Sequence, residues 1–493
     1  MGVLLLKRTN RILPVYAADI SGVCSALYEL GGMTVMHDAS GCNSTYTTHD
    51  EPRWYSMDSM VYISALSELE AVMGDDDKLV RDIVDAARNL HPRFICLGGT
   101  PIPMMMGTDF KGLARMIEKE TGIPTFGIAT NGMHSYVQGA GEALLQIAER
   151  FCPPVDELGK TAAEKGLTGK RNWENPGFGS IRLRVNILGA TPLDFSLTGN
   201  VSGIRKFLSR HGMETVGCWA MESSLDDMCL AGLADVNLVV SAVGLPAAME
   251  LERKYGTPYV IGAPIGRRTA LRLASLLRLG AVTGKNQTLF GGEPAVGETA
   301  VVETADVETA DVETADVETA DVEAADVEAA VVEAAVVEAA VVETAAEETA
   351  VGEAVDEKAA DREDADSKTV LFHANPGIPG LPDDLSRERV LIVGEQVIAG
   401  SLRCSLREDL GAQDVTVLCP TKGSGYMAEE GDMLVWDEDE AISRIGRSTV
   451  VIADPLYRQV CPGDGQRVFV DFPHEACSGR MYHSAMRPFI CGS

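Results

Sequence analysis

Two cysteines near the N-terminus have a residue type suited to metal chemistry. Cys24 and Cys42 have seventeen residues between them, and Cys42 lies in a turn of small residues, Ser40–Ser44. Cysteine thiolates are soft ligands that suit iron–sulfur clusters. Two of them supply half of a four-cysteine cluster site. Because free cysteine is also among the most buried residue types, the alternative is that both thiols only pack in a core.

The elements around these cysteines follow from the pattern of apolar residues and glycines. We expect a helix just after Cys24 that ends at Gly31 and Gly32, because glycine takes the positive φ of a helix C-cap without strain. Met33–Met36 predicts a short buried strand, and a glycine turn with Cys42 follows it. Both thiols are therefore expected at the ends of elements, where a backbone can wrap around a metal cluster.

Short motifs along the chain are similar to those of a known family. They are Leu13–Tyr16, Asp19–Cys24, His37–Cys42, Met106–Asp109, Ala234–Val239 and Lys254–Pro258. The chain resembles the nitrogenase component 1 superfamily in these motifs, and outside an acidic insert the resemblance covers most of its length. That superfamily includes the nitrogenase molybdenum–iron protein subunits, the dark-operative protochlorophyllide reductase subunits and a nickel-tetrapyrrole reductive cyclase.

The resemblance implies a role for the two cysteines. In the family, cysteines in these places ligate an iron–sulfur cluster at a subunit interface. A third cysteine used by the molybdenum–iron type is replaced here by Pro101, and Cys96, five residues earlier, is expected in the core of a strand. Two chains would then supply four thiolates for one [4Fe–4S] cluster, in a homodimer or in a heterodimer with a paralogous subunit.

A further cysteine of the family binds the catalytic metal cofactor, and Ser241 stands in its place here. A hydroxyl is a poor substitute for a thiolate on iron. The resemblance therefore does not extend to a molybdenum–iron cofactor bound in that way.

A glycine-rich junction between a predicted strand and a predicted helix is a candidate binding site. Gly262 and Gly266 allow close approach of a ligand, the helix start offers free N–H groups, and Arg267 and Arg268 add positive charge. We therefore expect an anionic ligand or substrate here. The alternative is an ordinary turn with surface arginines.

His474, near the end of the chain, is a candidate catalytic proton donor in a cleft, because imidazole titrates near neutral pH. His37 and His49 are alternatives for the same role, or they only form hydrogen bonds in the core. A metal site of His474, Cys477 and His483 is a further interpretation, but mixed ligands at irregular spacing give it little support.

Composition limits the class of function. The formal net charge is −31, and residues 293–368 contribute −22 of it from 25 acidic and 3 basic residues. The remaining −9 gives no basic footprint for nucleic acid. The sequence contains no run of about 18 apolar residues, so we expect no membrane-spanning helix. Eleven cysteines without a secretion signal favour the reducing cytoplasm.

The order of strand and helix patterns predicts the frame that positions these residues. An alternation of strands and helices indicates parallel sheets covered by helices, in an α/β fold of three Rossmann-like units. We expect these units at residues 1–152, 153–290 and 369–493. Ligands bind in such folds at the carboxyl edge of the sheet.

Residues 291–368 form an acidic low-complexity segment built on a five-residue repeat, ETADV changing to EAAVV. Residues five apart on a helix are rotated by about 140°, so the valines form no stripe. The acids also repel one another, and we expect a disordered linker between domains. A pentapeptide-repeat β-helix is the alternative, although stacked glutamates would give it a poor core.

These features together predict a subunit of a nitrogenase-like two-component oxidoreductase. The sequence contains no GxxxxGK[ST] motif, so the resemblance assigns ATP hydrolysis and delivery of low-potential electrons to a separate P-loop iron protein. The sequence does not identify the substrate. The alternatives are a non-catalytic cluster-assembly scaffold, a structural electron-relay subunit, and a small-molecule-binding module without a redox role.

Overall fold

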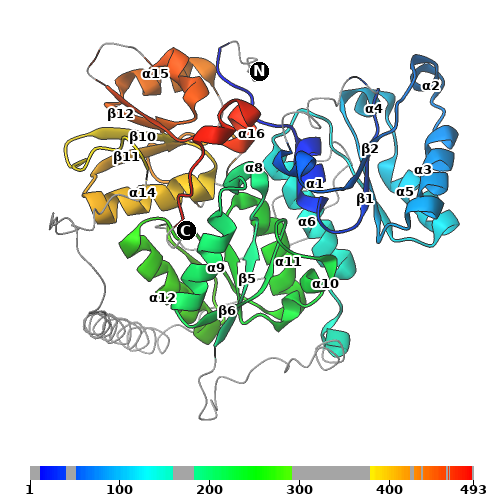
Figure 1. Ribbon diagram of the computed structural model, residues 1–493, viewed down its shortest axis with the longest axis horizontal. Helices are drawn as coiled ribbons and strands as arrows, with labels where there is room; N and C mark the ends of the chain where they lie inside the picture. Colours follow the sequence, from blue (N-terminus) through cyan, green and yellow to red (C-terminus); the bar gives the residue numbers. More distant parts are fainter. Residues whose placement is uncertain are drawn as a thin grey trace, which may run out of the picture. The chain divides into compact units, whose positions relative to one another are not determined.

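Three parallel sheets covered by helices are seen in the computed structural model (Figure 1). It describes residues 12–39, 41, 51–158, 182–290, 378–421, 423, 427–434, 437–461, 465 and 467–490. The predicted α/β fold of three Rossmann-like units is confirmed. Cys42, His49 and the acidic segment lie outside the described residues. The boundaries of the predicted domains stay predictions, and we use N-terminal, middle and C-terminal lobe for the described residues of 12–158, 182–290 and 378–490.

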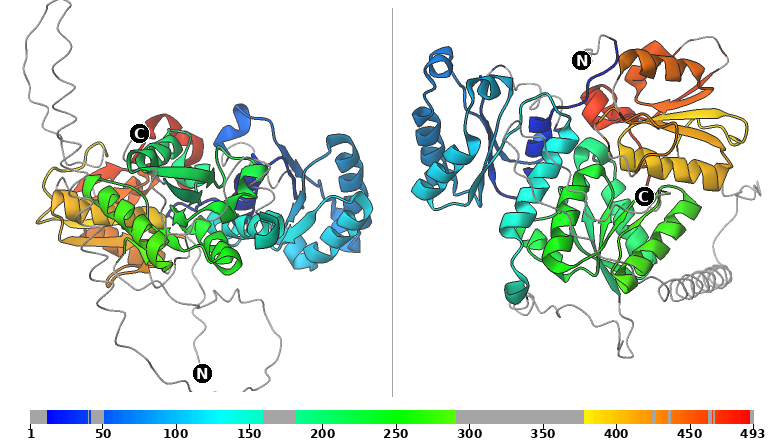
Figure 2. Two further views of the ribbon diagram at one scale, coloured as in Figure 1. Left: turned by 90° about the horizontal axis from the view of Figure 1, so that it is seen from below. Right: turned by 180° about the vertical axis from the view of Figure 1, so that it is seen from behind.

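The sheet of the N-terminal lobe has the strand order β2-β1-β3-β4, with all neighbours parallel. Its strands are β1 (Met33–Met36), β2 (Met60–Ile63), β3 (Ile95–Gly98) and β4 (Thr125–Ile128). Its longer helices are α1 (Asp19–Leu27), α3 (Asp77–Leu90), α5 (Phe110–Thr121) and α6 (Tyr136–Phe151), and its short ones are η2 (Pro52–Tyr55), α2 (Glu68–Met73) and α4 (Pro101–Met106). Helices α1 and α6 cover one face of the sheet and α3 and α5 the other, as both views of Figure 2 show.

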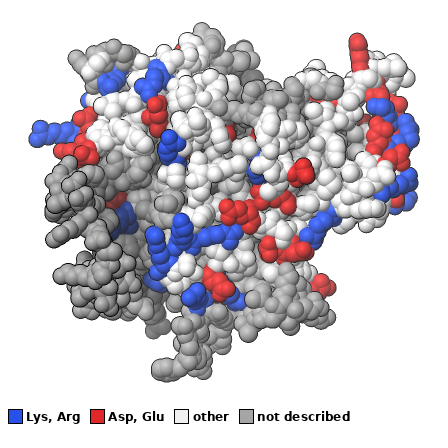
Figure 3. Space-filling view, viewed as in Figure 1, with Lys and Arg blue, Asp and Glu red and all other residues white. Residues whose placement is uncertain are grey.

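Helix α3 illustrates why these segments cover a sheet. Its buried residues recur at helical spacing and are Leu79, Val80, Ile83, Val84 and Ala87. They pack against β1 and β3. Its outer side carries charges of both signs, seen at the right edge of Figure 3. Lys78 and Arg88 pair there with Asp82 at 3.6 Å and Asp85 at 2.9 Å. The helix therefore has one apolar and one charged side.

The middle lobe has a five-stranded parallel sheet in the order β6-β5-β7-β8-β9. Its strands are β5 (Leu183–Leu188), β6 (Met213–Cys218), β7 (Val236–Val239), β8 (Tyr259–Ile261) and β9 (Gln287–Thr288). Its helices are α8 (Pro192–Phe195), α9 (Asn200–Arg210), α10 (Leu225–Met228), η3 (Ala231–Leu233), η4 (Ala242–Gly244), α11 (Leu245–Tyr255) and α12 (Arg267–Thr283).

The C-terminal lobe has a four-stranded parallel sheet in the order β11-β10-β12-β13. Its strands are β10 (Arg389–Val393), β11 (Asp414–Leu418), β12 (Val450–Ala453) and β13 (Val468–Asp471). Its helices are α14 (Gln396–Leu410), α15 (Glu438–Arg447), η7 (Pro455–Val460), α16 (Glu475–Ser478), η8 (Gly479–Met481) and η9 (His483–Ala485).

Helices α1 and α6 cross at two glycines. A Cβ atom on Gly22 would overlap the carbonyl oxygen of Tyr136, and one on Gly139 would overlap that of Asp19. The two backbones therefore touch directly. This crossing fixes α1, the helix that carries Cys24, against the rest of the lobe.

The first described residues connect the N-terminal lobe to the C-terminal lobe. The backbone N–H groups of Ile12 and Leu13 donate to the Glu438 carboxylate at 2.7 and 2.9 Å. The N–H of Ala17 donates to the carbonyl of Ala476 at 2.7 Å.

Within the described ranges, no helix combines the length and the apolar character needed to cross a membrane.

Candidate functional site

The predicted cluster ligand Cys24 lies inside α1 (Asp19–Leu27). The expectation that it lies at the end of an element is wrong, because the helix begins five residues earlier and continues past the cysteine. Its side chain is fully buried and packs with Ile20 and Met36. Cys42 lies outside the described residues, so the pairing of the two thiols stays a prediction.

Cys24 is the predicted cluster ligand that the structure describes, and its role as a ligand stays a prediction. Apolar side chains pack against it, with residues of β2 at the edge of the group. Low solvent exposure is one of the factors that set the potential of such clusters. No cysteine in the described part of the chain forms a disulfide. Cys96, by contrast, is buried in β3 as expected of a core residue, and burial raises the pKa of its thiol.

A buried carboxylate, Asp194, is the centre of a polar cluster to which all three lobes contribute. It accepts hydrogen bonds from the hydroxyls of Tyr136 at 2.5 Å and Ser241 at 2.6 Å. Nε2 of His474 lies 3.3 Å from the same carboxylate, within ion-pair distance but outside hydrogen-bond geometry. Together with Glu395, described below, we call these residues the Asp194 cluster.

Sheet topology explains why these residues meet. Each follows the carboxyl end of a strand: Tyr136 follows β4, Asp194 follows β5, Ser241 follows β7, Glu395 follows β10 and His474 follows β13. Loops at this edge of a parallel sheet form the ligand sites of α/β folds. The three lobes therefore meet at the carboxyl edges of their sheets.

Ser241 does not offer the donor set of a thiolate-bound metal cofactor. Its hydroxyl donates to Asp194 and accepts a weaker bond from the N–H of Val243 at 3.3 Å. The atoms around it are oxygens and N–H groups, which are poor ligands for iron in a sulfur-rich cofactor. The residues present therefore do not fit a cofactor held at this position.

Glu395 is a second buried carboxylate of the cluster. It caps α14 by accepting from the N–H groups of Val397 and Ile398, and it also accepts from Ala242 of the middle lobe at 3.0 Å. Burial and the nearby Asp194 charge raise the pKa of Glu395 to about 7. One proton at this position is therefore bound or released close to neutral pH.

This pKa predicts a pH-dependent stability. The folded protein holds the Glu395 proton up to about pH 7, whereas the ordinary carboxyl of the unfolded chain loses it near 4.5. The free energy of unfolding should therefore fall between these pH values, by up to about 3 kcal/mol, and level off above them. Glu395→Gln keeps one acceptor oxygen for the helix cap but has no proton to lose in this pH range. Its free energy of unfolding, measured with urea between pH 5 and 8, should therefore lack this decrease. An equal pH dependence in both proteins would contradict the assignment.

His474 is held firmly within the cluster. Its backbone N–H donates to Asp454 at 2.9 Å, and its ring contacts those of Tyr16 and Tyr136 at centroid distances of 5.5 and 6.0 Å. The predicted proton donor thus lies beside a carboxylate. For the alternative metal site with Cys477 and His483, no group of three or more His, Cys, Asp or Glu side chains suited to a metal occurs among the residues described.

The other histidine candidate that the structure describes, His37, lies apart from the cluster. It is buried in the N-terminal lobe, and its Nδ1 is 2.9 Å from the Ser64 hydroxyl. Burial lowers the pKa of His37. His37 is thus a buried histidine of that lobe, and a role as proton donor stays a prediction.

The glycine-rich junction at Gly262–Arg268 faces α14. The N–H groups of Arg267 and Arg268 donate to the Asp409 carboxylate at 3.0 and 3.2 Å. Gly266 allows this approach, since a Cβ there would overlap Ser405 and Asp409. The start of α12 therefore already holds an anion of the same chain. Binding of a separate anion stays a prediction and would require Asp409 to move.

Three residues of the cluster were not expected from the sequence: Asp194, Tyr136 and Glu395. The available signal was their position just after predicted strands, at the edge where ligands bind. Their polarity alone did not distinguish them from other loop residues.

A cavity of about 450 Å³ opens beside Asp194 and Glu475.

Comparison with known proteins identifies the family. The model of the nitrogenase component 1 type oxidoreductases matches residues 22–296. The nitrogenase iron-molybdenum cofactor biosynthesis protein NifE of Clostridium pasteurianum is 23% identical over 271 residues, covering 52% of this chain and 53% of that protein. The nitrogenase molybdenum-iron protein alpha chain of Crocosphaera subtropica is 25% identical, covering 42% and 40%. One of the subunits of the light-independent protochlorophyllide reductase of Nostoc punctiforme is 25% identical, covering 39% and 36%.

The chain spans about half the length, or less, of these curated relatives. The solved structure of nitrogenase Cp1 at pH 6.5 matches this chain with a TM-score of 0.55. The match covers 97% of this chain and 90% of the nitrogenase chain. At 14% identity this likeness shows the fold alone. Because the family model matches more than half of the residues, the chain belongs to the nitrogenase component 1 type oxidoreductases.

Proposed function

We propose that this chain is one subunit of a nitrogenase-like two-component oxidoreductase. In this proposal Cys24 and Cys42 hold an iron–sulfur cluster, [4Fe–4S], together with thiolates of a second copy or a paralogous subunit. A separate iron protein that hydrolyses ATP donates the electrons. Bound in this way, the cluster would supply one-electron transfer at low potential.

The observation that carries the proposal is the meeting of His474, Tyr136 and Ser241 at Asp194. Reduction of a substrate consumes protons as well as electrons. A histidine near a buried carboxylate is suited to hold a proton and release it. Glu395, whose pKa burial raises to about 7, is a second proton store in the same cluster. The chain's own residues thus hold and deliver protons beside a cavity large enough for a substrate.

Iron content tests the proposal directly. We expect anaerobically purified protein to contain iron and sulfide, and Cys24→Ala and Cys42→Ala each to lose most of both, because a cluster shared between subunits loses two of its four ligands in a symmetric dimer. Cys96→Ala is the matched control, since it removes a buried thiol from the same lobe and should keep its iron. Iron-free wild-type protein with no visible-region absorbance would contradict the proposal.

A second candidate is a scaffold on which a metal cluster is assembled, without catalysis. It is favoured by the hydroxyl of Ser241 in the place of the cofactor cysteine and by the similarity to NifE, a cofactor biosynthesis protein. A scaffold would pass its iron to an acceptor protein, whereas a reductase component would retain it and oxidise a reduced, ATP-loaded iron protein. Following the iron after mixing with each partner separates the two.

A further inference from the structure

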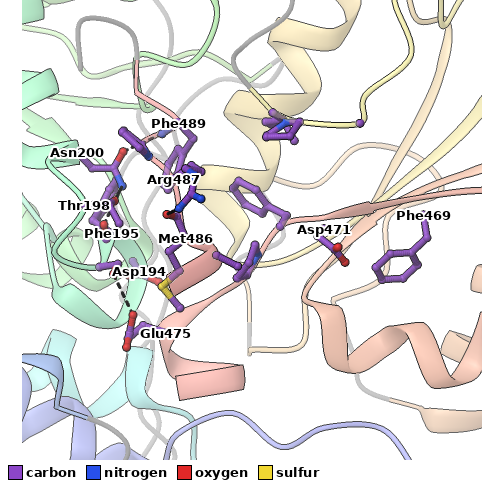
Figure 4. Close-up of a pocket in the computed structure, with 18 residues that line it drawn as sticks. Asp194, Phe195, Thr198, Asn200, Phe469, Asp471, Glu475, Met486, Arg487 and Phe489 are labelled. Carbon is purple, nitrogen blue, oxygen red and sulfur yellow. Dashed lines mark hydrogen bonds between the residues drawn. The ribbon is translucent and has the colours of Figure 1, made fainter. Parts of the chain in front are cut away.

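The cavity beside the Asp194 cluster has walls of a definite chemistry. It is formed by α8 and the start of α9 in the middle lobe and by residues on either side of α16 in the C-terminal lobe (Figure 4). Its volume of about 450 Å³ falls within the range of small-molecule sites, about 300–1,000 Å³. It is therefore large enough for an organic ligand of moderate size.

One wall is aromatic and is fixed by hydrogen bonds. The rings of Phe195 and Phe489 stack at a centroid distance of 5.8 Å, and Phe472 meets Phe489 edge-on at 5.2 Å. Asn200 holds the two lobes together here, since it donates to the carbonyl of Phe195 and accepts from the N–H of Phe489. Figure 4 shows Phe195, Phe489 and Asn200 on the same side of the pocket. A fixed wall of rings favours a flat ligand.

The other prominent wall is acidic. Glu475 is only 3% exposed, accepts a hydrogen bond from Ser196 at 2.9 Å and lies 3.3 Å from Nδ1 of His483. Burial raises the pKa of Glu475, and the hydrogen bond from Ser196 and the nearby His483 oppose this rise.

The charges around the cavity disfavour an anionic ligand. Asp194 and Asp471 line it together with Glu475, whereas the described lining includes a single cationic side chain, Arg487. The Arg487 guanidinium is directed to main-chain carbonyls, which it binds at Ser484 and Met486. Asp471 already pairs with Arg458 at 2.6 Å. Asp194 and Glu475 therefore form the acidic side of the cavity, where positive charge in a ligand would be favoured.

We propose that this cavity binds a small planar organic cation, with its ring against Phe472 and Phe489 and its N–H groups paired with Glu475. An aromatic amidine or amine has this chemistry, since it combines a flat apolar surface with charged N–H donors. The inference rests on the proposed function only in taking the cavity as that reductase's substrate site. Binding itself is measured without any redox reaction.

Calorimetric titration of the full-length, anaerobically purified protein with benzamidine tests the site. Benzoate is the matched probe, because it carries the same ring with the opposite charge. We expect benzamidine to bind at least about tenfold more tightly than benzoate, a difference typical of one good charged contact. Equal affinity of the two probes, or no binding of benzamidine at millimolar concentration, would overturn the proposal.

Two variants locate the binding. Glu475→Gln should weaken benzamidine binding by at least about tenfold, and Phe489→Leu, which keeps an apolar side chain but loses the ring, by about threefold or more. Glu120→Gln on the exposed side of α5 is the matched control and should bind as wild type does. If Glu475→Gln fails to fold, the benzamidine affinity of Phe489→Leu tests the location of the site. Unchanged affinity in a folded Glu475→Gln or Phe489→Leu protein would overturn the assignment.

The iron content of the same preparations separates this inference from the proposed function. Protein that contains iron but does not favour benzamidine over benzoate leaves the cluster proposal standing and removes the cation site. Protein without iron that binds benzamidine at Glu475 supports the cation site and removes the reductase assignment.

Discussion

Replacing Arg53 by methionine is expected to lower the free energy of unfolding by about 3–5 kcal/mol, the usual cost of breaking a buried ion pair. The Arg53 side chain is 3% exposed, and its partners Glu51 and Glu29 are 0% and 11% exposed. The guanidinium binds both carboxylates and also the carbonyls of Ser25 and Ala220. Methionine would leave Glu51 charged, buried and without its cation.

A double variant separates the ion pair from loss of packing. Removing Glu51 as well, in Arg53→Met/Glu51→Met, takes away the uncompensated charge and should recover part of the lost stability. The measurement is urea-induced unfolding followed by tryptophan fluorescence. A single variant that loses less than about 1 kcal/mol would assign Arg53 to the weak surface class of ion pairs.

Arg53 also links two lobes through the helix that carries Cys24. Ser25 follows Cys24 in α1, and Ala220 belongs to a middle-lobe turn in which Ala220 and Glu222 have positive φ values of 91° and 54°. Side chains rarely adopt this backbone region without support from their surroundings. The N–H of Glu222 donates to Glu29, so the arginine, its two acids and the turn form one connected network.

Gly139→Ala is the second substitution with a large expected effect. The added methyl group would meet the Asp19 carbonyl, and because a backbone cannot rotate away as a side chain does, α1 and α6 must separate. We expect a loss of about 3 kcal/mol in the free energy of unfolding, at the upper end for overpacking.

Gly446→Ala is the matched control for this prediction. Gly446 also lies within a helix, α15, and in the described structure a Cβ there has open space around it. Removing a helical glycine from such a position should stabilise the protein by about 0.5–1 kcal/mol. Opposite signs for the two substitutions, read from thermal unfolding, would establish the helix crossing. A neutral Gly139→Ala would show that the two helices separate easily.

Elements with a strong local pattern could be predicted closely from the sequence. The predicted strand Met33–Met36 agrees with β1, and the predicted alternation of strands and helices agrees with the three parallel sheets. By contrast, β2 was missed, because Met60–Ile63 is a short edge strand whose side chains are only partly buried and do not alternate.

The candidate site was predictable only in part. Ser241 and His474 were identified for separate reasons, and they approach each other only through Asp194. The partners of Asp194 in Tyr136 and Ser241 are 58 and 47 residues away along the chain. No local pattern reports a contact of this kind. The same holds for Gly22 and Gly139, whose role depends on a helix crossing that no window of sequence contains.

The hydrogen bonds of the first described residues have a consequence for synthesis on the ribosome. Leu13 binds the side chain of a residue 425 positions later. At about 5–20 residues per second, a nascent chain waits roughly 20–85 s before that partner is translated. Leu13 therefore completes this contact late in synthesis, and a chaperone that holds short extended segments has this interval in which to bind.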